Sequence, residues 1–397
     1  MQYSQLISSM EESATLGIAK KVRALKAEGR DIIGLTLGEP DFDTPEHIRE
    51  AAKQALDKGF THYPPVTGYP ALREAIVAKL KRDNGLDYAA DQIVVSTGAK
   101  QSLYNVVLAM LNPGDHAILI APYWVSYRAM LHLAQAEVTE IETDIAAAYK
   151  VTPEQLEAAI KPNTRLLFLN TPSNPTGSMY SREELEALVE VLERHPQVYV
   201  ISDEIYEYIT FGMEHVSLGT LGNMFDRTIT VNGFSKGFAM TGWRLGYIAA
   251  PREIAKLTEK LQGQSTSGAN AFAQQGAIAA MTGGMESVNA MRDEFLKRRD
   301  MLFADLKAIE GLEVILPDGA FYFYPDLKNF LGKTTPAGQK LTDINELCLY
   351  LIEEEGLALV PGAAFGTKSH VRLSYAYSEQ ELKEAAKRLG SGLGKLS

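Results

Sequence analysis

The stretch RLLFLNTPSNPTGSMYSREELEALVEVLERHPQVYVIS, residues 165–202, predicts a strand, a helix and a second strand in succession. Its two ends, RLLFLN (165–170) and VYVIS (198–202), are short runs rich in apolar and β-branched residues, a pattern typical of buried strands. Between them, Ser181 and Glu184 have the spacing of a capping box, and an apolar stripe with helical spacing follows. A unit of this kind favours two parallel strands with the helix packed across them.

The same alternation extends along the chain in both directions. A helix is predicted after Gly98 and another after Thr152, in each case between apolar runs. Strands alternating with helices predict an α/β fold with a mostly parallel sheet that helices cover on both faces. The further predicted strands are residues 93–96, 117–121, 228–232 and 245–250.

The pattern changes near residue 286. A long helical pattern over 286–309 precedes a strand-rich stretch over 314–327, and a final helix is capped by Ser378 with Glu381. We therefore predict a large domain over 46–285 and a smaller α+β domain over 286–397. The N-terminal segment, 1–45, could pack on either domain, and we place it with the small one.

Composition narrows the class of protein. The chain has 397 residues, of which 46 % are hydrophobic and 22 % charged, so it can bury a large core. The net charge of -11 opposes binding to nucleic acid or to anionic membranes. The single cysteine excludes an intrachain disulfide. With no secretory signal and no long apolar span visible, we predict a cytoplasmic protein.

Residues suited to chemistry lie where the predicted strands end. In an open α/β sheet the ligand lies beyond the carboxyl ends of the strands. These ends would supply amides, an aromatic ring, a carboxylate, a phenol and an amine, a set that suits a flat, polar, anionic cofactor. The segments are STGAK (96–100), APYW (121–124), TPSNPTG (171–177), DEIY (203–206) and GFSK (233–236).

Six segments in order resemble the signature segments of class I pyridoxal-phosphate aminotransferases. One segment alone would be weak support, but the six together span nearly the whole chain. The resemblance implies a fold type I transferase with pyridoxal 5'-phosphate as cofactor. The segments are GEPDFDTP (38–45), HYPPVTGYPALREA (62–75), TPSNPTG (171–177), SDEIYEY (202–208), NGFSKGFAMTGWRLGY (232–247) and VRLSYA (371–376).

The resemblance implies that Lys236 binds the cofactor aldehyde covalently and then moves the proton of the substrate α-carbon. It implies that Asp203 holds the protonated pyridine nitrogen, and that Tyr206 and Asn174 contact the phenolic oxygen of the cofactor. Each residue also has an ordinary alternative. These are a solvated lysine, a helix-capping aspartate, a core tyrosine and a turn asparagine.

A phosphate is expected where Gly98, Ala99 and Lys100 open a helix, because free N–H groups and the helix dipole favour an anion there. The resemblance adds Ser235 and Arg244 to this phosphate site.

Two aromatic residues have implied roles around the cofactor. Trp124 would stack on its ring and touch substrate, although a core tryptophan is the alternative. Tyr63 resembles a family tyrosine that reaches the phosphate from the neighbouring subunit. The resemblance therefore implies a homodimer with shared active sites.

The resemblance implies that the substrate α-carboxylate binds to Arg372 and to the backbone N–H of Gly38. The planar guanidinium of Arg372 can donate two parallel hydrogen bonds to a carboxylate, a geometry that lysine cannot provide. Asn174 would also contact substrate. For Arg372, a solvated arginine on an edge strand is the alternative.

In the most similar subgroup, a lysine at the Lys100 position and a threonine at the Thr15 position serve dicarboxylic substrates. The alternatives are a solvated first-turn lysine and a threonine that caps the helix near Leu16. The implied reaction is a ping-pong transamination between aspartate and 2-oxoglutarate, and several members also accept prephenate. Gly237 departs from the alanine that is commoner in the family.

Other functions remain open on sequence grounds. An aromatic-amino-acid aminotransferase would differ only in the substrate pocket. A lyase or synthase on the same fold would keep Lys236, Asp203 and Arg372. A transcriptional regulator on this fold would usually add a DNA-binding region, and the negative charge opposes it.

Overall fold

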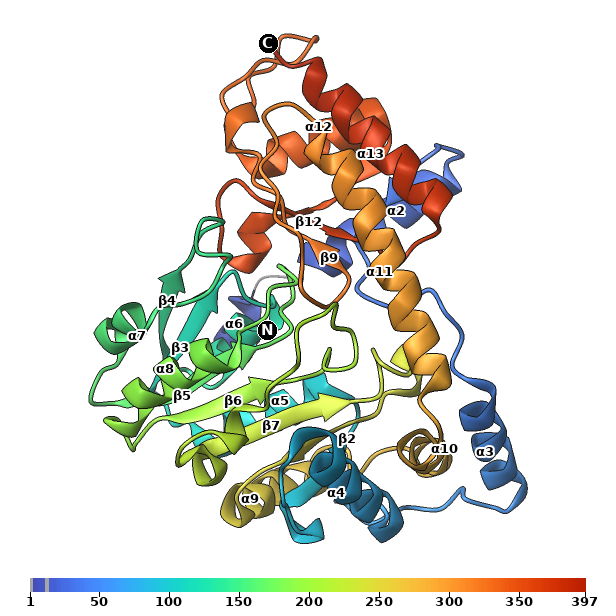
Figure 1. Ribbon diagram of the computed structural model, residues 1–397, viewed down its shortest axis with the longest axis vertical. Helices are drawn as coiled ribbons and strands as arrows, with labels where there is room; N and C mark the ends of the chain where they lie inside the picture. Colours follow the sequence, from blue (N-terminus) through green and yellow to red (C-terminus); the bar gives the residue numbers. More distant parts are fainter. Residues whose placement is uncertain (1–2, 11–13) are drawn as a thin grey trace.

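Seven strands form one sheet in the order β2–β8–β7–β6–β5–β3–β4 (Figure 1). The computed structural model describes residues 3–10 and 14–397. The pairs from β4 to β7 are parallel, whereas β8 is antiparallel to both β7 and β2. The predicted α/β class with a mostly parallel sheet is confirmed. The strands are β2 (Ile93–Ser96), β3 (His116–Ala121), β4 (Glu137–Glu142), β5 (Thr164–Asn170), β6 (Tyr199–Asp203), β7 (Thr228–Gly233) and β8 (Gly246–Ala249).

Six of these strands coincide with the predicted apolar runs, but β4 was not predicted. It lies at the sheet edge and reads EVTEIE, with only Ile141 buried, so it offers no apolar run. The direction of β8 was not predicted either. Residues 234–245 contain no α-helix to carry the chain back across the sheet, so the chain returns antiparallel to β7.

Both faces of the sheet are buried, as expected for parallel strands. Alternate residues of β5 serve opposite faces: Leu166 and Phe168 pack in one apolar cluster, and Leu167 and Leu169 in another. The helices around the sheet are α3 (Glu46–Asp57), α4 (Pro70–Asn84), α5 (Ala99–Met110), α6 (Ser126–Leu133), α7 (Pro153–Ala159), α8 (Arg182–Glu193), α9 (Arg252–Gly263) and α10 (Ala271–Thr282).

Helix starts follow the predicted capping residues. The side chains of Thr152, Ser181 and Ser378 accept hydrogen bonds from backbone N–H groups in the first turns of α7, α8 and the C-terminal helix α13 (Glu379–Gly394). Each helix also has the reciprocal contact of a capping box, which satisfies amides that would otherwise lack a partner.

The C-terminal part of the chain forms a separate layer above the sheet (Figure 1). Of the predicted strand-rich stretch 314–327, only β9 (Tyr322–Phe323) forms a strand, and it pairs with β12 (Val371–Ser374). The remaining elements of this part are α11 (Glu286–Lys307), α12 (Ile344–Glu355), β10 (Leu357–Ala358), β11 (Val360–Pro361) and α13 (Glu379–Gly394).

The N-terminal segment contributes α1 (Gln5–Ser8), α2 (Ala14–Ala27) and β1 (Ile33–Gly34). Strand β1 pairs in parallel with β10 of the C-terminal part, although more than 300 residues separate them in sequence. The domain boundaries near residues 45 and 286 stay predictions.

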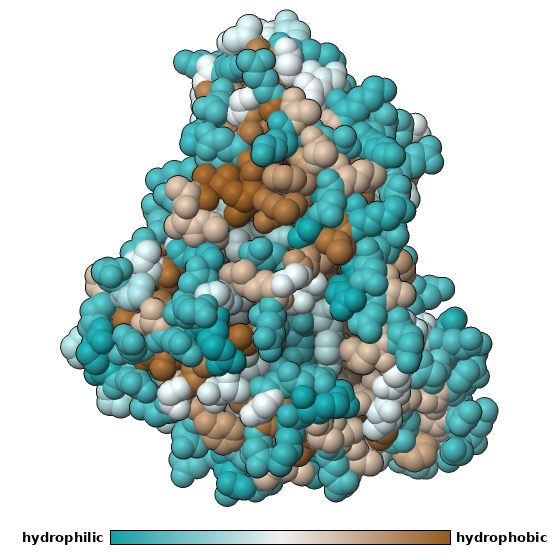
Figure 2. All heavy atoms as spheres, in the orientation of Figure 1, coloured by the Kyte–Doolittle hydropathy of each residue, from teal (hydrophilic) through white to brown (hydrophobic). Residues whose placement is uncertain are grey.

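Figure 2 shows polar side chains over most of one face, with an apolar patch on the C-terminal part. Among the residues that the structure describes, no helix combines the length and the apolar character needed to cross a bilayer.

Candidate active site

A cavity of about 370 Å³ lies at the carboxyl ends of the central strands. Its walls come from the ends of β5, β6 and β7, the start of α5, the segment around Gly38, and strands β9 and β12. The predicted site residues that line it are Gly38, Ala99, Lys100, Trp124, Asn174, Asp203, Tyr206, Ser235, Lys236, Arg244 and Arg372.

Lys236 follows β7 and is partly buried in this cavity. Its Nζ donates a hydrogen bond to the carbonyl oxygen of Gly38. Burial lowers the pKa of Lys236 to about 8, with the nearby charges of Arg372 and Arg244 acting in the same direction and that of Glu39 against it. An amine with this pKa is partly neutral near pH 7.5, as a nucleophile or a proton carrier must be.

Asp203 is the last residue of β6 and is buried. Its Oδ2 accepts a hydrogen bond of 2.6 Å from the hydroxyl of Tyr127, and its Oδ1 accepts one of 3.3 Å from the backbone N–H of Ile205. Burial raises the pKa of Asp203 to about 6, while these hydrogen bonds oppose the rise. Folding has already removed water from this carboxylate. A cationic group can therefore bind to it strongly, because little further desolvation of the carboxylate is needed.

Asn170, the last residue of β5, joins two predicted site residues. Its Nδ2 donates to the backbone oxygen of Asp203 at 2.8 Å, and its Oδ1 accepts from the backbone N–H of Asn174 at 2.8 Å. The ends of β5 and β6 are thereby held in register where the cavity begins. Neither Asn170 nor Tyr127 was among the predicted site residues. Tyr127 lies three residues after Trp124, one helical turn away, and that spacing could have indicated it.

Tyr206 contacts a residue from the far end of the chain. Its hydroxyl lies 2.7 Å from that of Tyr322 in β9, and both side chains are buried. Tyr322 was also not predicted. No local pattern joins residues that are 116 positions apart.

The start of α5 is built to hold an anion. Gly98 has a φ of 85°, a conformation that favours glycine, and the first N–H groups of the helix after it have no carbonyl partner within the helix. A Cβ atom at Gly98 would lie 2.7 Å from Nη2 of Arg244, so glycine permits the guanidinium to approach the helix start. Ser235 lines the same cavity. The arrangement suits a phosphate group.

Arg372, in β12, is buried rather than solvated. Its Nη1 donates to Oδ1 of Asn174 at 3.0 Å and its Nη2 donates to the backbone oxygen of Thr36 at 2.7 Å. The guanidinium also lies over the ring of Tyr322, 4.7 Å from the ring centroid. Its Nε is buried without a hydrogen-bond partner among the described residues, so a donor remains available. A guanidinium held in this way can bind a carboxylate.

Lys100 and Trp124 lie together at the cavity. Nζ of Lys100 is 4.9 Å from the centroid of the Trp124 ring. Partial burial lowers the pKa of Lys100, and the charge of Arg244 lowers it further. A second cationic side chain therefore lines the cavity that contains Arg372.

Among the described residues, Gly98 and Tyr63 are predicted site residues that do not line this cavity. Tyr63 is 96 % exposed and lies in a separate groove formed by residues 60–64 and 266–272. The side chain of Thr15, in α2, lies outside the part of the chain that the structure describes.

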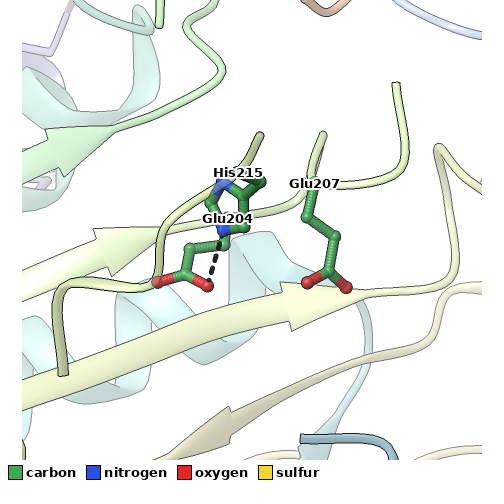
Figure 3. A group of neighbouring side chains, drawn as sticks. All are labelled: Glu204, Glu207 and His215. Atoms are coloured by element: carbon green, nitrogen blue, oxygen red, sulfur yellow. Dashed lines mark hydrogen bonds and ion pairs between the residues drawn. The ribbon is translucent and has the colours of Figure 1, made fainter. Parts of the chain in front are cut away.

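A buried charge cluster begins at Glu204, the residue that follows Asp203 in the chain (Figure 3). Ligand atoms of Glu204, Glu207 and His215 lie within 4.8 Å of one another, a spacing that a metal ion could use. Their oxygens already have donors, however. Lys79 Nζ contacts Glu207, and Glu204 accepts from His215 at 3.0 Å and from Ser217 and Ser202. Burial lowers the pKa of His215, but the adjacent Glu204 carboxylate outweighs it and raises that pKa. We therefore interpret the cluster as paired charges that support the end of β6.

The chain is similar to known proteins over almost its whole length. The family model "Aminotransferase class I and II" matches residues 30–389. The chain is 45 % identical to an aspartate/prephenate aminotransferase of Cereibacter sphaeroides, over 97 % of each chain. It is 43 % identical to an aspartate aminotransferase of Rhizobium meliloti, over 100 % of this chain and 97 % of the relative.

Solved structures show the same relationship. An aspartate aminotransferase from Rhizobium meliloti superimposes with a TM-score of 0.97 at 43 % identity and covers 100 % of both chains. An aspartate aminotransferase from Thermus thermophilus with maleate gives a TM-score of 0.92 at 40 % identity, over 98 % of this chain and 99 % of that one. The chain belongs to the class I and II aminotransferase family.

Proposed function

We propose that this chain transfers the amino group between aspartate and 2-oxoglutarate, with oxaloacetate and glutamate as products and pyridoxal 5'-phosphate as cofactor. The observation that carries the proposal is the meeting of Lys236, Asp203 and Arg372 in one cavity. An amine with a lowered pKa, a desolvated carboxylate and a buried guanidinium are the three groups that this reaction needs.

The residues of the cavity fit the cofactor. The start of α5 with Arg244 and Ser235 would hold its phosphate. Asp203 would pair with its ring nitrogen, and Trp124 would stack on its ring. The hydroxyl of Tyr206 and the free amide group of Asn174, whose Oδ1 is used by Arg372, would contact its phenolic oxygen. When bound, the cofactor accepts the amino group and delocalises the electrons of the bond that breaks at the substrate α-carbon.

The chain's own residues bind the substrate and move its proton. The Arg372 fork and the backbone N–H of Gly38 would hold the α-carboxylate and thereby fix the direction of the bond between the α-carbon and its hydrogen. Lys236 Nζ, once free, would take that proton and return it at a different atom. The lowered pKa of Lys236 supports both the uptake and the return of this proton.

Lys100 supports the choice of a dicarboxylic substrate. With Arg372 for one carboxylate, a second cation in the same cavity suits a second carboxylate. The Cereibacter sphaeroides relative is named for aspartate and prephenate, both of which carry two carboxyl groups, and the Thermus thermophilus structure is described with maleate. We propose prephenate as a further amino acceptor.

The substitution Lys100→Met should test this assignment, because it removes the charge and keeps the length of the side chain. We expect kcat/KM for aspartate to fall roughly 10- to 100-fold, the effect of one charge-assisted hydrogen bond. Turnover of an aromatic amino donor should change far less and serves as the internal control. An equal loss for both donors would contradict a role in substrate choice.

A panel of amino donors against 2-oxoglutarate and oxaloacetate, with formation of arogenate from prephenate, tests the reaction itself. Aspartate should be among the best donors. A clear preference for aromatic donors would favour an aromatic aminotransferase, and an aromatic aminotransferase from Pyrococcus horikoshii is 37 % identical with a TM-score of 0.87. Release of ammonia without the amine form of the cofactor would indicate a lyase.

We also propose that the chain acts as a homodimer in which Tyr63 completes the partner's phosphate site. A tyrosine that is 96 % exposed in the single chain supports this, because so large an aromatic surface is usually covered. Light scattering should give twice the chain mass of 43.6 kDa. A fully active monomer would contradict the proposal.

A further inference from the structure

Tyr322 lies at the centre of the predicted site, although no sequence pattern pointed to it. It is fully buried, and its hydroxyl is 2.7 Å from that of Tyr206. Its ring lies beneath the guanidinium of Arg372, 4.7 Å from centroid to Cζ. A Cβ atom at Gly38 would lie only 2.4 Å from its hydroxyl oxygen, so the hydroxyl occupies space that any other residue at position 38 would fill.

The surroundings of Tyr322 determine the direction of its hydrogen bond. Burial raises the pKa of both phenols, so each keeps its proton. In residues 3–10 and 14–397, the only hydrogen bond of the Tyr322 hydroxyl is the one to Tyr206. The neighbouring guanidinium of Arg372 has no acceptor to offer. If Tyr206 donated to Tyr322, the Tyr322 proton would lie beside the positively charged guanidinium of Arg372 with no protein acceptor, which is costly.

The opposite direction leaves no such cost. When Tyr322 donates to Tyr206, the Tyr206 proton is free to point into the cavity that both residues line. The cation of Arg372 over the Tyr322 ring makes that phenol a stronger donor, since positive charge favours loss of its proton.

We propose that Tyr322 is a positioning residue, whose hydroxyl donates to Tyr206 and so directs the Tyr206 proton to the acceptor in the cavity. This inference rests on the proposed function, in which that acceptor is the phenolic oxygen of the cofactor. Tyr322 thereby joins the carboxylate-binding Arg372 to the cofactor-binding Tyr206 through one side chain. Its hydroxyl acts through Tyr206 and touches no reacting atom.

The test measures how the absorbance of the protein loaded with pyridoxal 5'-phosphate changes with pH. A hydrogen-bond donor to the phenolic oxygen of the cofactor withdraws negative charge from that oxygen. Loss of the donor should therefore raise the pH at the midpoint of the absorbance change. The substitution Tyr206→Phe should raise the midpoint by at least about one pH unit, the effect of a charge-assisted hydrogen bond. The substitution Tyr322→Phe should raise it by roughly half a unit, as expected for weakening a neutral one.

The double variant Tyr206→Phe/Tyr322→Phe distinguishes positioning from general damage. Because Tyr322 acts through Tyr206, the double variant should have the midpoint of Tyr206→Phe alone. Tyr324→Phe is the matched control, since Tyr324 is also a buried phenol, two residues further on, with its hydroxyl 2.6 Å from Thr367 Oγ1. Its midpoint should equal that of the unmodified protein.

Two results would overturn the inference: an unchanged midpoint in Tyr322→Phe, or shifts in the double variant that equal the sum of the single ones. Failure of the proposed function gives a different result, because the unmodified protein would then show no cofactor absorbance that depends on Lys236.

Discussion

A variant in which alanine replaces Lys236 is expected to lose transaminase activity by at least about 10⁴-fold, since both covalent attachment and proton transfer are removed. The alanine leaves the phosphate site, Asp203 and Arg372 intact, so the cofactor should still bind, although without a covalent bond. Steady-state assays with aspartate and 2-oxoglutarate measure the first effect. Borohydride reduction followed by mass spectrometry measures the second.

The substitution Lys383→Ala is a suitable control, because Lys383 is an exposed lysine of α13 that does not line the cavity. It should keep both activity and the reducible bond. If Lys236→Ala retained the bond, the attachment site would lie elsewhere and the proposed mechanism would be wrong.

The substitution Asp203→Asn is expected to lower kcat by roughly 10³-fold, the size of effect found when a preorganised electrostatic contact is lost. Asparagine keeps the shape of the side chain and an acceptor for Tyr127, but it removes the charge that would hold a protonated ring nitrogen. KM for aspartate should change little, because Arg372 and Lys100 are unaltered. The control Asp326→Asn changes a buried aspartate that does not line the cavity and should keep kcat.

The substitution Asp203→Asn should also stabilise the cofactor-free protein at neutral pH. The pKa of Asp203 is raised from 3.8 to about 6, so folding favours its protonated form. The contribution of Asp203 to the free energy of unfolding is complete below about pH 4 and is lost as the pH rises through 6. Because asparagine does not titrate, the stability of the variant relative to the unmodified protein should increase between pH 4 and 6. The gain should reach at most about 3 kcal/mol above pH 6.

Urea denaturation of both proteins between pH 4.5 and 8 measures this difference. Cofactor should reduce it, because a positively charged ring nitrogen would compensate the buried carboxylate. A difference in stability that does not vary with pH would show that the carboxylate is not the cause.

Much of the fold was predictable because its signals are local. Buried strands such as 93–96 and 165–170 need continuous apolar residues, and the helix starts at Thr152, Ser181 and Ser378 need a hydroxyl at one position. The edge strand β4 was not predicted, because most of its residues are at least partly exposed and need not be apolar. The antiparallel direction of β8 depends on its neighbours, which local patterns do not report.

The predicted site residues divide in the same way. Lys236 and Asp203 were indicated by strand ends together with a family resemblance. Tyr127, Asn170 and Tyr322 were missed, since each acts by contacting another residue of the site. No local sequence pattern distinguishes Tyr322, because aromatic residues are common in buried strands.

By itself, the sequence determined the alternation of strands and helices, the cap residues and the identity of the groups at the strand ends, since all of these depend on neighbours within a few positions. Only the tertiary structure decided which of those groups meet. It brought Arg372 against Asn174 and Tyr322 against Tyr206, and it buried Asp203 so that its pKa rises. The physical reason is that desolvation and hydrogen-bond direction depend on residues distant in sequence, which folding alone brings within a few ångströms.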